Sequence, residues 1–323
     1  MFKVAVLGDT TWGKTLARLS AVRGATVSVW SRTESKAAEN DKEMGNYSGK
    51  LSFTGDIKET LKTADFIICA VPAQRMRDNL KLGAPHIHSS AILISVAKGL
   101  EAQTGKRMSE VIADEVKATS PEMICALSGP NLSGEINQGL PATSVVAGSD
   151  LKVVRNVQGL LDSPDFAIFI SDDIVGVELC GALKNVIAVG AGIMDGLELG
   201  NNAKAAFITL GWKDVVALGT AMGARQDTFF GLAGLGDLIA TGNSPLSRNH
   251  YVGCELGKGR ALGDIMKSMT QVAEGVDTAM AAHRLVQRAK LNAPIVDLVY
   301  RVLFEALPPA EISIRFKNGL KTD

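Results

Sequence analysis

Short apolar segments alternate with stretches of helical periodicity through the first half of the chain. Several of these segments are apolar throughout, as in strands that a parallel sheet buries on both faces. The expected strands are Lys3–Leu7, Thr26–Trp30, Phe66–Val71, Ala91–Val96, Met123–Ser128, Thr143–Gly148 and Phe166–Ser171. Strand and helix in alternation predict an α/β fold, with a doubly wound, Rossmann-like domain over residues 1–170.

The pattern changes after Ser171, where no further strand is evident. The segment 172–194 is apolar on nearly all sides, which predicts a long buried helix with Ser171 or Asp172 as its N-cap. Helical periodicity continues through 203–222, 277–291 and 294–307. We therefore expect an all-α second domain over residues 171–323.

Composition limits the classes of function. Lys and Arg together number 34, as do Asp and Glu, so the chain lacks the basic excess of most nucleic-acid-binding proteins. The four cysteines stand far apart among apolar neighbours, as in a protein of the reducing cytoplasm. We expect neither a signal peptide nor a membrane span.

The turn after the first strand is close to a dinucleotide-binding motif. Gly8 and Gly13 occupy the first and third positions of G-x-G-x-x-G, but Thr10 stands at the second, where its Cβ takes space that a pyrophosphate normally approaches. The N–H groups of Thr11 and Trp12 could still bind phosphate at the helix N-terminus. An ordinary strand–helix turn is the alternative.

The end of the second strand bears on the choice of cofactor. NAD sites usually have an acidic residue there, on the ribose hydroxyls. This chain has Ser31 and Arg32 instead, and an arginine suits a 2′-phosphate, which favours NADP(H). A solvated surface arginine is the alternative.

Lys184 lies in the middle of the apolar helix. Lysine is rarely buried unless it is paired or functional, and burial lowers its pKa, as proton transfer requires. Asp237, in a glycine-rich apolar setting, could pair with a lysine. Lys98 and Gly129 follow buried strands, at the sheet edge where α/β proteins bind ligands. A lysine whose amine reaches water is the alternative for Lys184.

Three consecutive polar residues, Ser247, Arg248 and Asn249, offer a hydroxyl, a guanidinium fork and an amide. This combination suits a phosphate ester. An exposed arginine in a polar turn is the alternative. His86 and His88 have no cysteine or carboxylate cluster near them in the sequence, so we expect no metal site.

The ordered motifs of the chain resemble those of the NAD(P)-dependent glycerol-3-phosphate dehydrogenases of the bacterial and plastid type. They are WGKTLA, AVPAQRMR, AKGLE, LSGPN, GVELCGALKNVIAVGAGIMDGLELGNNAKAA, TFFGLAGLGDL, SRN and AEGVDTA. Related β-hydroxyacid and 6-phosphogluconate dehydrogenases share the architecture but lack these strings.

The resemblance implies reversible hydride transfer between NAD(P)H and dihydroxyacetone phosphate, which gives sn-glycerol 3-phosphate for glycerolipid and phospholipid synthesis. Matching positions imply Lys184 as general acid/base at the C2 oxygen, Lys98 as a cation that polarises the carbonyl, and Asp237 as a residue that orients the lysine and the substrate hydroxyl. The implied substrate-binding residues are Lys98, Gly129, Asn131, Lys184, Asp237, Ser247, Arg248 and Asn249. The implied cofactor-binding residues are Thr11, Trp12, Arg32, Lys98, Ser133, Arg248, Val272 and Glu274.

The departures from the family pattern lie mostly in the cofactor half. Asp9 and Thr10 replace the usual Ala-Gly, and Ser133 stands where alanine is usual. A cofactor-binding sensor without efficient turnover is therefore a second hypothesis, and a related dehydrogenase acting on another small phosphorylated or carboxylated substrate is a third. The apolar, glycine-rich helical half is compatible with a homodimer and equally with a tightly packed monomer.

Overall fold

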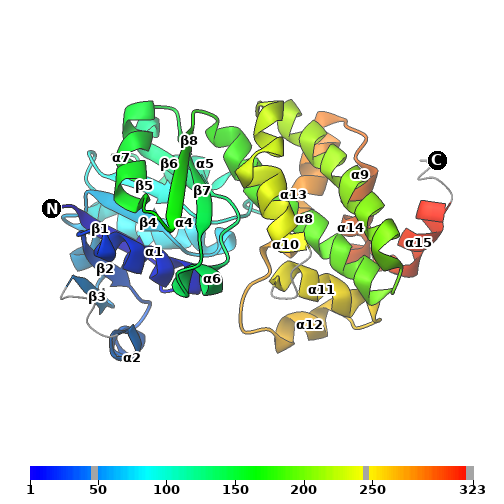
Figure 1. The fold of residues 1–323 in the computed structure, drawn as a ribbon, viewed down its shortest axis with the longest axis horizontal. Helices are drawn as coiled ribbons and strands as arrows, with labels where there is room; N and C mark the ends of the chain where they lie inside the picture. The colour runs from blue at the N-terminus through cyan, green and yellow to red at the C-terminus, as the bar shows by residue number, and fades with distance from the viewer. Residues whose placement is uncertain (45–49, 243–246, 318–323) are drawn as a thin grey trace. The chain divides into compact units, whose positions relative to one another are not determined.

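The computed structural model describes residues 1–44, 50–242 and 247–317. Its internal contacts divide the chain into two compact units, Met1–Ala97 with Arg107–Val177, and Lys98–Lys106 with Glu178–Asp323 (Figure 1). The sequence predicts a single division after residue 170. The structure adds that Lys98–Lys106, which interrupts the first unit in sequence, packs with the second.

The first unit is built on one eight-stranded sheet, with strand order β3-β2-β1-β4-β5-β6-β7-β8. The strands are β1 (Lys3–Leu7), β2 (Thr26–Trp30), β3 (Leu51–Thr54), β4 (Phe66–Cys69), β5 (Ile92–Ser95), β6 (Ile124–Ser128), β7 (Ala142–Gly148) and β8 (Phe166–Ser171). The order of β1 to β6 is that of a doubly wound dinucleotide-binding fold, so the predicted Rossmann-like domain is confirmed. The short edge strand β3 is absent from the sequence prediction.

The last two strands reverse direction. β1 to β6 pair in parallel, whereas β7 pairs antiparallel with β6 and parallel with β8. Between β6 and β7 the chain forms only the short helix α6 (Ser133–Asn137). An antiparallel return needs no long crossover, which is why so short a connection suffices.

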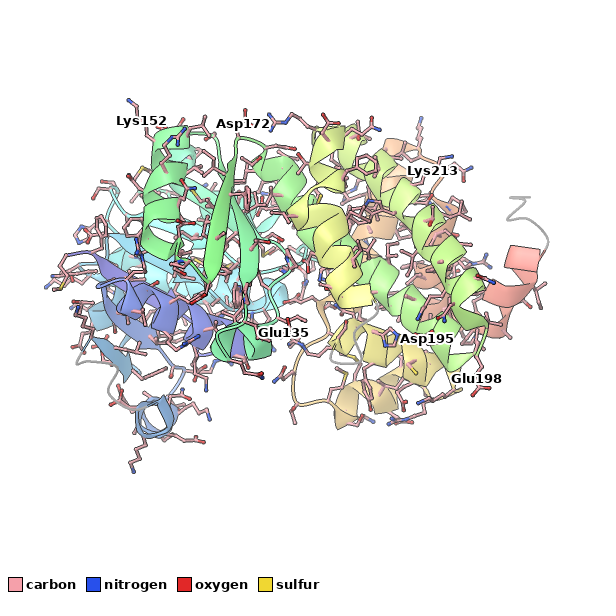
Figure 2. All side chains as sticks on the ribbon, in the orientation of Figure 1. Glu135, Lys152, Asp172, Asp195, Glu198 and Lys213 are labelled. Carbon is pink, nitrogen blue, oxygen red and sulfur yellow. The ribbon has the colours of Figure 1, made fainter. Side chains whose placement is uncertain are left out.

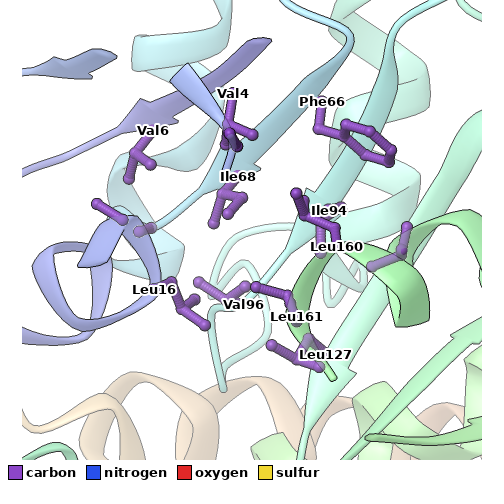
Figure 3. Close-up of a cluster of buried hydrophobic side chains, with 14 of the residues drawn as sticks. Val4, Val6, Leu16, Phe66, Ile68, Ile94, Val96, Leu127, Leu160 and Leu161 are labelled. Atoms are coloured by element: carbon purple, nitrogen blue, oxygen red, sulfur yellow. The ribbon is translucent and has the colours of Figure 1, made fainter. Parts of the chain in front are cut away.

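Helices cover both faces of the sheet. They are α1 (Thr11–Val22), α2 (Glu34–Met44), α3 (Ile57–Leu61), α4 (Ala73–Gly83), η1 (Ala84–His86), α5 (Met108–Glu115), η2 (Pro121–Met123), α6 and α7 (Leu151–Leu161). Val4 and Val6 of β1 contribute to a cluster with α1, α6 and α7. Ala5 and Leu7 contribute to a second cluster, with α3, α4 and α5. Figure 3 shows Val4 and Val6 in the first cluster, with Leu16 of α1. The alternation follows from the two-residue period of a strand.

The second unit contains only helices among its described residues, so the predicted all-α domain is confirmed. They are α8 (Ile174–Gly196), α9 (Gly200–Ala221), η3 (Gln226–Phe230), η4 (Leu232–Gly236), α10 (Asp237–Gly242), α11 (Arg248–Gly257), α12 (Leu262–Ser268), α13 (Glu274–Ala289), α14 (Pro294–Phe304) and α15 (Ala310–Lys317). Figure 2 shows the charged side chains of Lys213 and Glu198 at the outside of this unit, where both residues are exposed.

Helix α8 forms the core of the second unit. In the described part of the chain it alone is long and apolar enough to cross a membrane, and 89% of its most apolar window is buried inside the structure. Burial of this kind is typical of a core helix in a globular domain. The burial predicted for the segment around Lys184 is therefore confirmed.

A close crossing of α8 and α11 fixes the position of α11. A Cβ added to Gly253 of α11 would lie 1.9 Å from the carbonyl oxygen of Val189, and one added to Gly192 of α8 would lie 2.1 Å from that of His250. Only glycine permits backbones to approach this closely. The crossing places the first turn of α11, which begins at Arg248, beside α8.

Candidate active site

A buried carboxylate lies between two lysines in the helical unit. Asp237, the first residue of α10, accepts a hydrogen bond from Lys184 Nζ to Oδ1 at 3.1 Å and one from Lys98 Nζ to Oδ2 at 2.8 Å. The Lys184 and Asp237 side chains are 5% and 3% exposed, and that of Lys98 is 19% exposed. One negative charge therefore partly compensates two positive charges, and the set retains a net positive charge that suits an anionic ligand.

Thr241 completes the hydrogen bonding of Lys184. Its hydroxyl accepts from Lys184 Nζ at 2.5 Å and donates to Asp237 Oδ1 at 3.1 Å. Asp237 and Thr241 are four residues apart on α10 and therefore lie on the same face of the helix. The position of the Lys184 amine is thus defined by a carboxylate and a hydroxyl together.

The surroundings of Lys184 bring its pKa close to neutral pH. Burial lowers the pKa of Lys184 from 10.5 to about 8, with Asp237 opposing this shift and the charges of Lys98 and Arg248 adding to it. Burial alone would raise the pKa of the Asp237 carboxyl, but the two lysines hold it below its usual value. The site thus contains an ionised carboxylate and an amine able to gain or lose a proton near physiological pH.

Asn185 anchors the segment that carries Lys98. Its side-chain amide donates to the Lys98 carbonyl oxygen at 2.8 Å and to the Gly181 carbonyl oxygen at 3.2 Å. The backbone of Lys98 is therefore attached to α8 one residue beyond Lys184. This bond explains how a lysine that follows β5 in the chain belongs to the helical unit.

The polar triplet Ser247-Arg248-Asn249 forms the start of α11. The Ser247 hydroxyl is the N-cap and accepts from His250 N at 3.3 Å, while Arg248 Nη1 donates to the Val272 carbonyl oxygen at 3.0 Å. Asn249 Oδ1 accepts from Gly275 N at 2.9 Å. A helix N-terminus with an adjacent guanidinium is an arrangement that binds anions.

The triplet also lies near the other predicted cofactor contacts of the helical unit. Val272 accepts the bond from Arg248, and Glu274 is the first residue of α13. The structure thus brings Lys98, Lys184 and Asp237 into direct contact, and groups Arg248 with Val272.

The remaining predicted residues belong to the first unit. Gly8 has φ of +107°, and a Cβ added to Gly13 would lie 2.4 Å from the Gly8 carbonyl oxygen, so both glycines serve the turn as expected. Thr10 is the N-cap of α1, and its hydroxyl accepts from Gly13 N at 3.0 Å and donates to the Ala70 carbonyl oxygen at 2.9 Å. Threonine is accommodated at the middle position because its hydroxyl bonds within the turn and to the end of β4.

Gly129, Asn131 and Ser133 lie together after β6. Gly129 has φ of +150°, and an added Cβ would lie 3.0 Å from Ser144 Cα. Asn131 Nδ2 donates to Ser144 Oγ at 3.0 Å, while its buried Oδ1 has no hydrogen-bond partner among the described residues. Ser133 begins α6. The orphan oxygen of Asn131 is a feature that a bound polar ligand would satisfy.

Two family models match the chain. Residues 3–154 match the N-terminal part of NAD-dependent glycerol-3-phosphate dehydrogenase, and residues 173–313 match its C-terminal part. The chain belongs to the NAD-dependent glycerol-3-phosphate dehydrogenase family. Members of this family interconvert glycerol 3-phosphate and dihydroxyacetone phosphate with NAD(P), and the chain is an oxidoreductase of this kind.

Individual relatives agree with the family assignment. The chain is 47% identical over 323 residues to glycerol-3-phosphate dehydrogenase [NAD(P)+] of Dehalococcoides mccartyi, covering 96% of this chain and 89% of the relative. It is 40% identical to the enzyme of the same name from Syntrophotalea carbinolica, covering 99% of each chain. The crystal structure of glycerol-3-phosphate dehydrogenase from Coxiella burnetii superposes with a TM-score of 0.91 at 30% identity, covering 99% of both chains.

The first unit of this dehydrogenase fits a dinucleotide. Thr11 and Trp12 lie in the first turn of α1, so no carbonyl oxygen of a preceding helical turn accepts from their backbone N–H groups. The buried indole N–H of Trp12 has no hydrogen-bond partner among the described residues. Arg32, two residues beyond the end of β2, is exposed. These groups can hold a pyrophosphate and a 2′-phosphate.

One residue of the lysine–carboxylate set was absent from the sequence prediction. Thr241 is a common residue in an unremarkable stretch, and only its spacing of four from Asp237 on a helix could have signalled its place in the site.

Proposed function

We propose that Lys184 is the general acid/base in the interconversion of dihydroxyacetone phosphate and sn-glycerol 3-phosphate. A nicotinamide cofactor bound to the first unit would supply or accept the hydride at C2. In the reduction, the Lys184 ammonium donates its proton to the oxygen on C2 and becomes a neutral amine, and in the oxidation the amine takes that proton back. The pKa of about 8 supports this role, because both protonation states are populated near neutral pH.

Lys98 and Asp237 are proposed to serve the same step in different ways. The Lys98 ammonium stabilises the negative charge that develops on the C2 oxygen. The Asp237 carboxylate orients both amines through its two oxygens, at 2.8 and 3.1 Å. Because each lysine bonds to a different oxygen of one carboxylate, the two ammonium groups are held close together despite their like charge.

Ser247, Arg248 and Asn249 are proposed to bind the substrate phosphate, with Gly129 and Asn131 contributing to substrate binding from the first unit. The N-terminus of α11 and the Arg248 guanidinium are both suited to a phosphate dianion. Binding energy at the phosphate, remote from C2, holds the ketone in position for reaction.

Thr11, Trp12, Arg32 and Ser133 of the first unit are proposed to bind the cofactor, as are Lys98, Arg248, Val272 and Glu274 of the second. Arg32 supports a preference for NADP(H), with NAD(H) accepted as an alternative, because its guanidinium is exposed at the carboxyl end of β2.

The product is proposed to supply glycerolipid and phospholipid synthesis. The enzyme is proposed to act in the cytoplasm, because its four cysteines are all free thiols. A homodimer is also proposed. The exposed apolar side chains Leu210, Phe230 and Ile239 of the helical unit support it. A molar mass measured by light scattering at twice that of the chain would agree with the dimer, and the mass of one chain would exclude it.

The contact of Lys184 with Asp237 in a buried setting is the observation that carries the proposed function. We would measure initial rates of dihydroxyacetone phosphate reduction with NADPH and NADH, for the wild type and Lys184→Ala. Activity that collapses in the variant supports the proposal. Cofactor binding without turnover by the folded wild type would instead favour a sensor.

The phosphate site has its own test. Arg248→Ala is expected to raise KM for dihydroxyacetone phosphate by about tenfold or more, as expected for loss of a charge-assisted hydrogen bond to phosphate. An unchanged KM in this variant would assign the substrate phosphate to other residues.

A further inference from the structure

The end of β2 carries no acidic residue, although NAD sites usually have one there. Trp30 ends the strand, and Ser31 and Arg32 follow it. In dinucleotide-binding folds, the acid at this position binds the hydroxyls of the adenosine ribose. At this position the sequence therefore offers no carboxylate to accept from the hydroxyls of an unphosphorylated ribose.

The structure places a carboxylate near this position from a different element. Asn40 of α2 donates one amide hydrogen bond to Asp9 Oδ2 at 2.7 Å and another to Ser31 Oγ at 3.2 Å. The Asp9 carboxylate therefore lies within about 6 Å of the Ser31 hydroxyl. Asp9 stands in the turn between β1 and α1, so a carboxylate from this turn lies close to the end of β2.

The carboxylate is held in a defined orientation. Ser31 and Asn40 are each 0% exposed, and both amide hydrogens of Asn40 are used in the two bonds described. Lys14 Nζ lies 3.4 Å from Asn40 Oδ1 and fixes the other end of that amide. Asp9 itself is only half-buried, and its Oδ1 has no hydrogen-bond partner among the described residues. One carboxylate oxygen is therefore anchored, and the other is available to a ligand.

We propose that Asp9 is a specificity-determining residue of the cofactor site, which accepts a hydrogen bond from a hydroxyl of the adenosine ribose and so supports the use of NAD(H). The inference rests on the proposed dehydrogenase function. The resemblance described above implies alanine at this position, so Asp9 is one of the departures of this chain from the family pattern.

Asp9 and Arg32 then act in opposite directions. The Arg32 guanidinium attracts a 2′-phosphate, whereas the Asp9 carboxylate repels it and bonds a free hydroxyl instead. A like charge within reach of the ribose is expected to change NADPH affinity by about tenfold at an intermediate effective dielectric constant. The chain should therefore discriminate less between the two cofactors than Arg32 alone would dictate.

Direct binding measurements test the inference without turnover. Dissociation constants for NADPH and NADH would be determined by isothermal titration calorimetry, without substrate, for the wild type, Asp9→Asn and Asp9→Ala. Glu39→Gln is the matched control, because it removes a carboxylate beside Asn40 on the exposed face of α2, where Glu39 is paired with Lys36. Circular dichroism would verify that each variant is folded.

The expected result is a change of opposite sign for the two cofactors. Asp9→Asn should tighten NADPH about tenfold, and Asp9→Ala should weaken NADH about tenfold through loss of a charged acceptor. Glu39→Gln should shift neither constant by more than about twofold, as expected for a screened surface charge.

Two results would overturn the inference: constants that move together for NADPH and NADH, or constants that do not move at all. The first would mean that Asp9 only shapes the turn. Should Asp9→Ala fail to fold, the isosteric Asp9→Asn variant still decides between these outcomes. Failure of both cofactors to bind the wild type would instead refute the proposed dehydrogenase function.

Discussion

Replacing Asp237 by asparagine removes a negative charge that both Lys184 and Lys98 contact, with little change in shape. Asp237→Asn keeps an oxygen that can accept from Lys184 but leaves the two ammonium groups without their shared anion. Because Asp237 raises the pKa of Lys184 against the effect of burial, its neutralisation should lower that pKa further below 8.

The size of the effect follows from the contact distance. Removal of an opposite charge at 3.1 Å in a buried site is expected to lower the pKa of Lys184 by about 1–3 units. With a pKa lowered to about 6, the protonated fraction of Lys184 at pH 7.5 falls from about three-quarters to about 3%, which predicts a roughly 25-fold slower reduction. At about pH 5.5 the protonated fraction returns to about three-quarters, so much of the loss should be recovered.

The assay is the pH dependence of kcat for dihydroxyacetone phosphate reduction under saturating cofactor, for the wild type and Asp237→Asn. Asp214→Asn is the control, since it neutralises another buried carboxylate of the helical unit outside the lysine cluster. Its pH profile should overlay that of the wild type. A rate for Asp237→Asn that is equally low at every pH would refute the reasoning, because the carboxylate would then act by position and not through the protonation of Lys184.

Three further predictions follow from single observations. In the wild type, the reduction rate should fall as pH rises through about 8 while the oxidation rate rises, because the two directions need the ammonium and the amine forms of Lys184; initial rates in both directions test this. Burial raises the pKa of Asp214 to about 6, so the native state holds this proton more tightly than the unfolded state does. The free energy of unfolding should therefore fall as the pH rises from about 4 to about 6. Urea unfolding should show that Asp214→Asn, which keeps an acceptor for Ile295 N–H, removes up to about 3 kcal/mol of this fall. Gly253→Ala should destabilise the helical unit by about 3 kcal/mol or more, because its Cβ would lie 1.9 Å from the Val189 carbonyl oxygen; a loss below about 1 kcal/mol on urea unfolding would contradict the close crossing.

The fold could be predicted where a segment's pattern alone decides its structure. The apolar runs of β1 and β4 and the long apolar helix α8 are examples, because burial on all sides leaves a continuous hydrophobic signal. β3 was missed because its four residues, Leu51–Thr54, lie at the sheet edge and show only partial burial. The reversal at β7 was also not predictable, since strand direction depends on pairing between distant segments.

The sequence indicates that Asp237 could pair with a lysine, but it does not give the geometry of the contact with Lys184 and Lys98. Lys184 can be picked out from the sequence because a charged residue is rare in an apolar helix. Asp237 can be picked out because a carboxylate is equally rare among glycines and apolar residues. Thr10 departs from the glycine expected in a dinucleotide-binding turn, and the structure shows that its hydroxyl accepts from Gly13 N and donates to the Ala70 carbonyl oxygen. The residue that accepts it, Ala70, is distant in sequence, so the local pattern could not show how the turn accommodates a threonine.

The protonation of Lys184 depends on residues from three separate parts of the chain, which is why only the structure defines it. Burial in α8 would by itself favour a neutral amine, and the charge of Lys98 adds to that tendency. Asp237 partly offsets both effects, so the pKa is about 8 instead of lower still. Lys98 occupies its place because Asn185, the neighbour of Lys184, binds its carbonyl oxygen. The same turn of α8 therefore provides the amine proposed to transfer the proton and anchors Lys98, whose charge lowers the pKa of that amine.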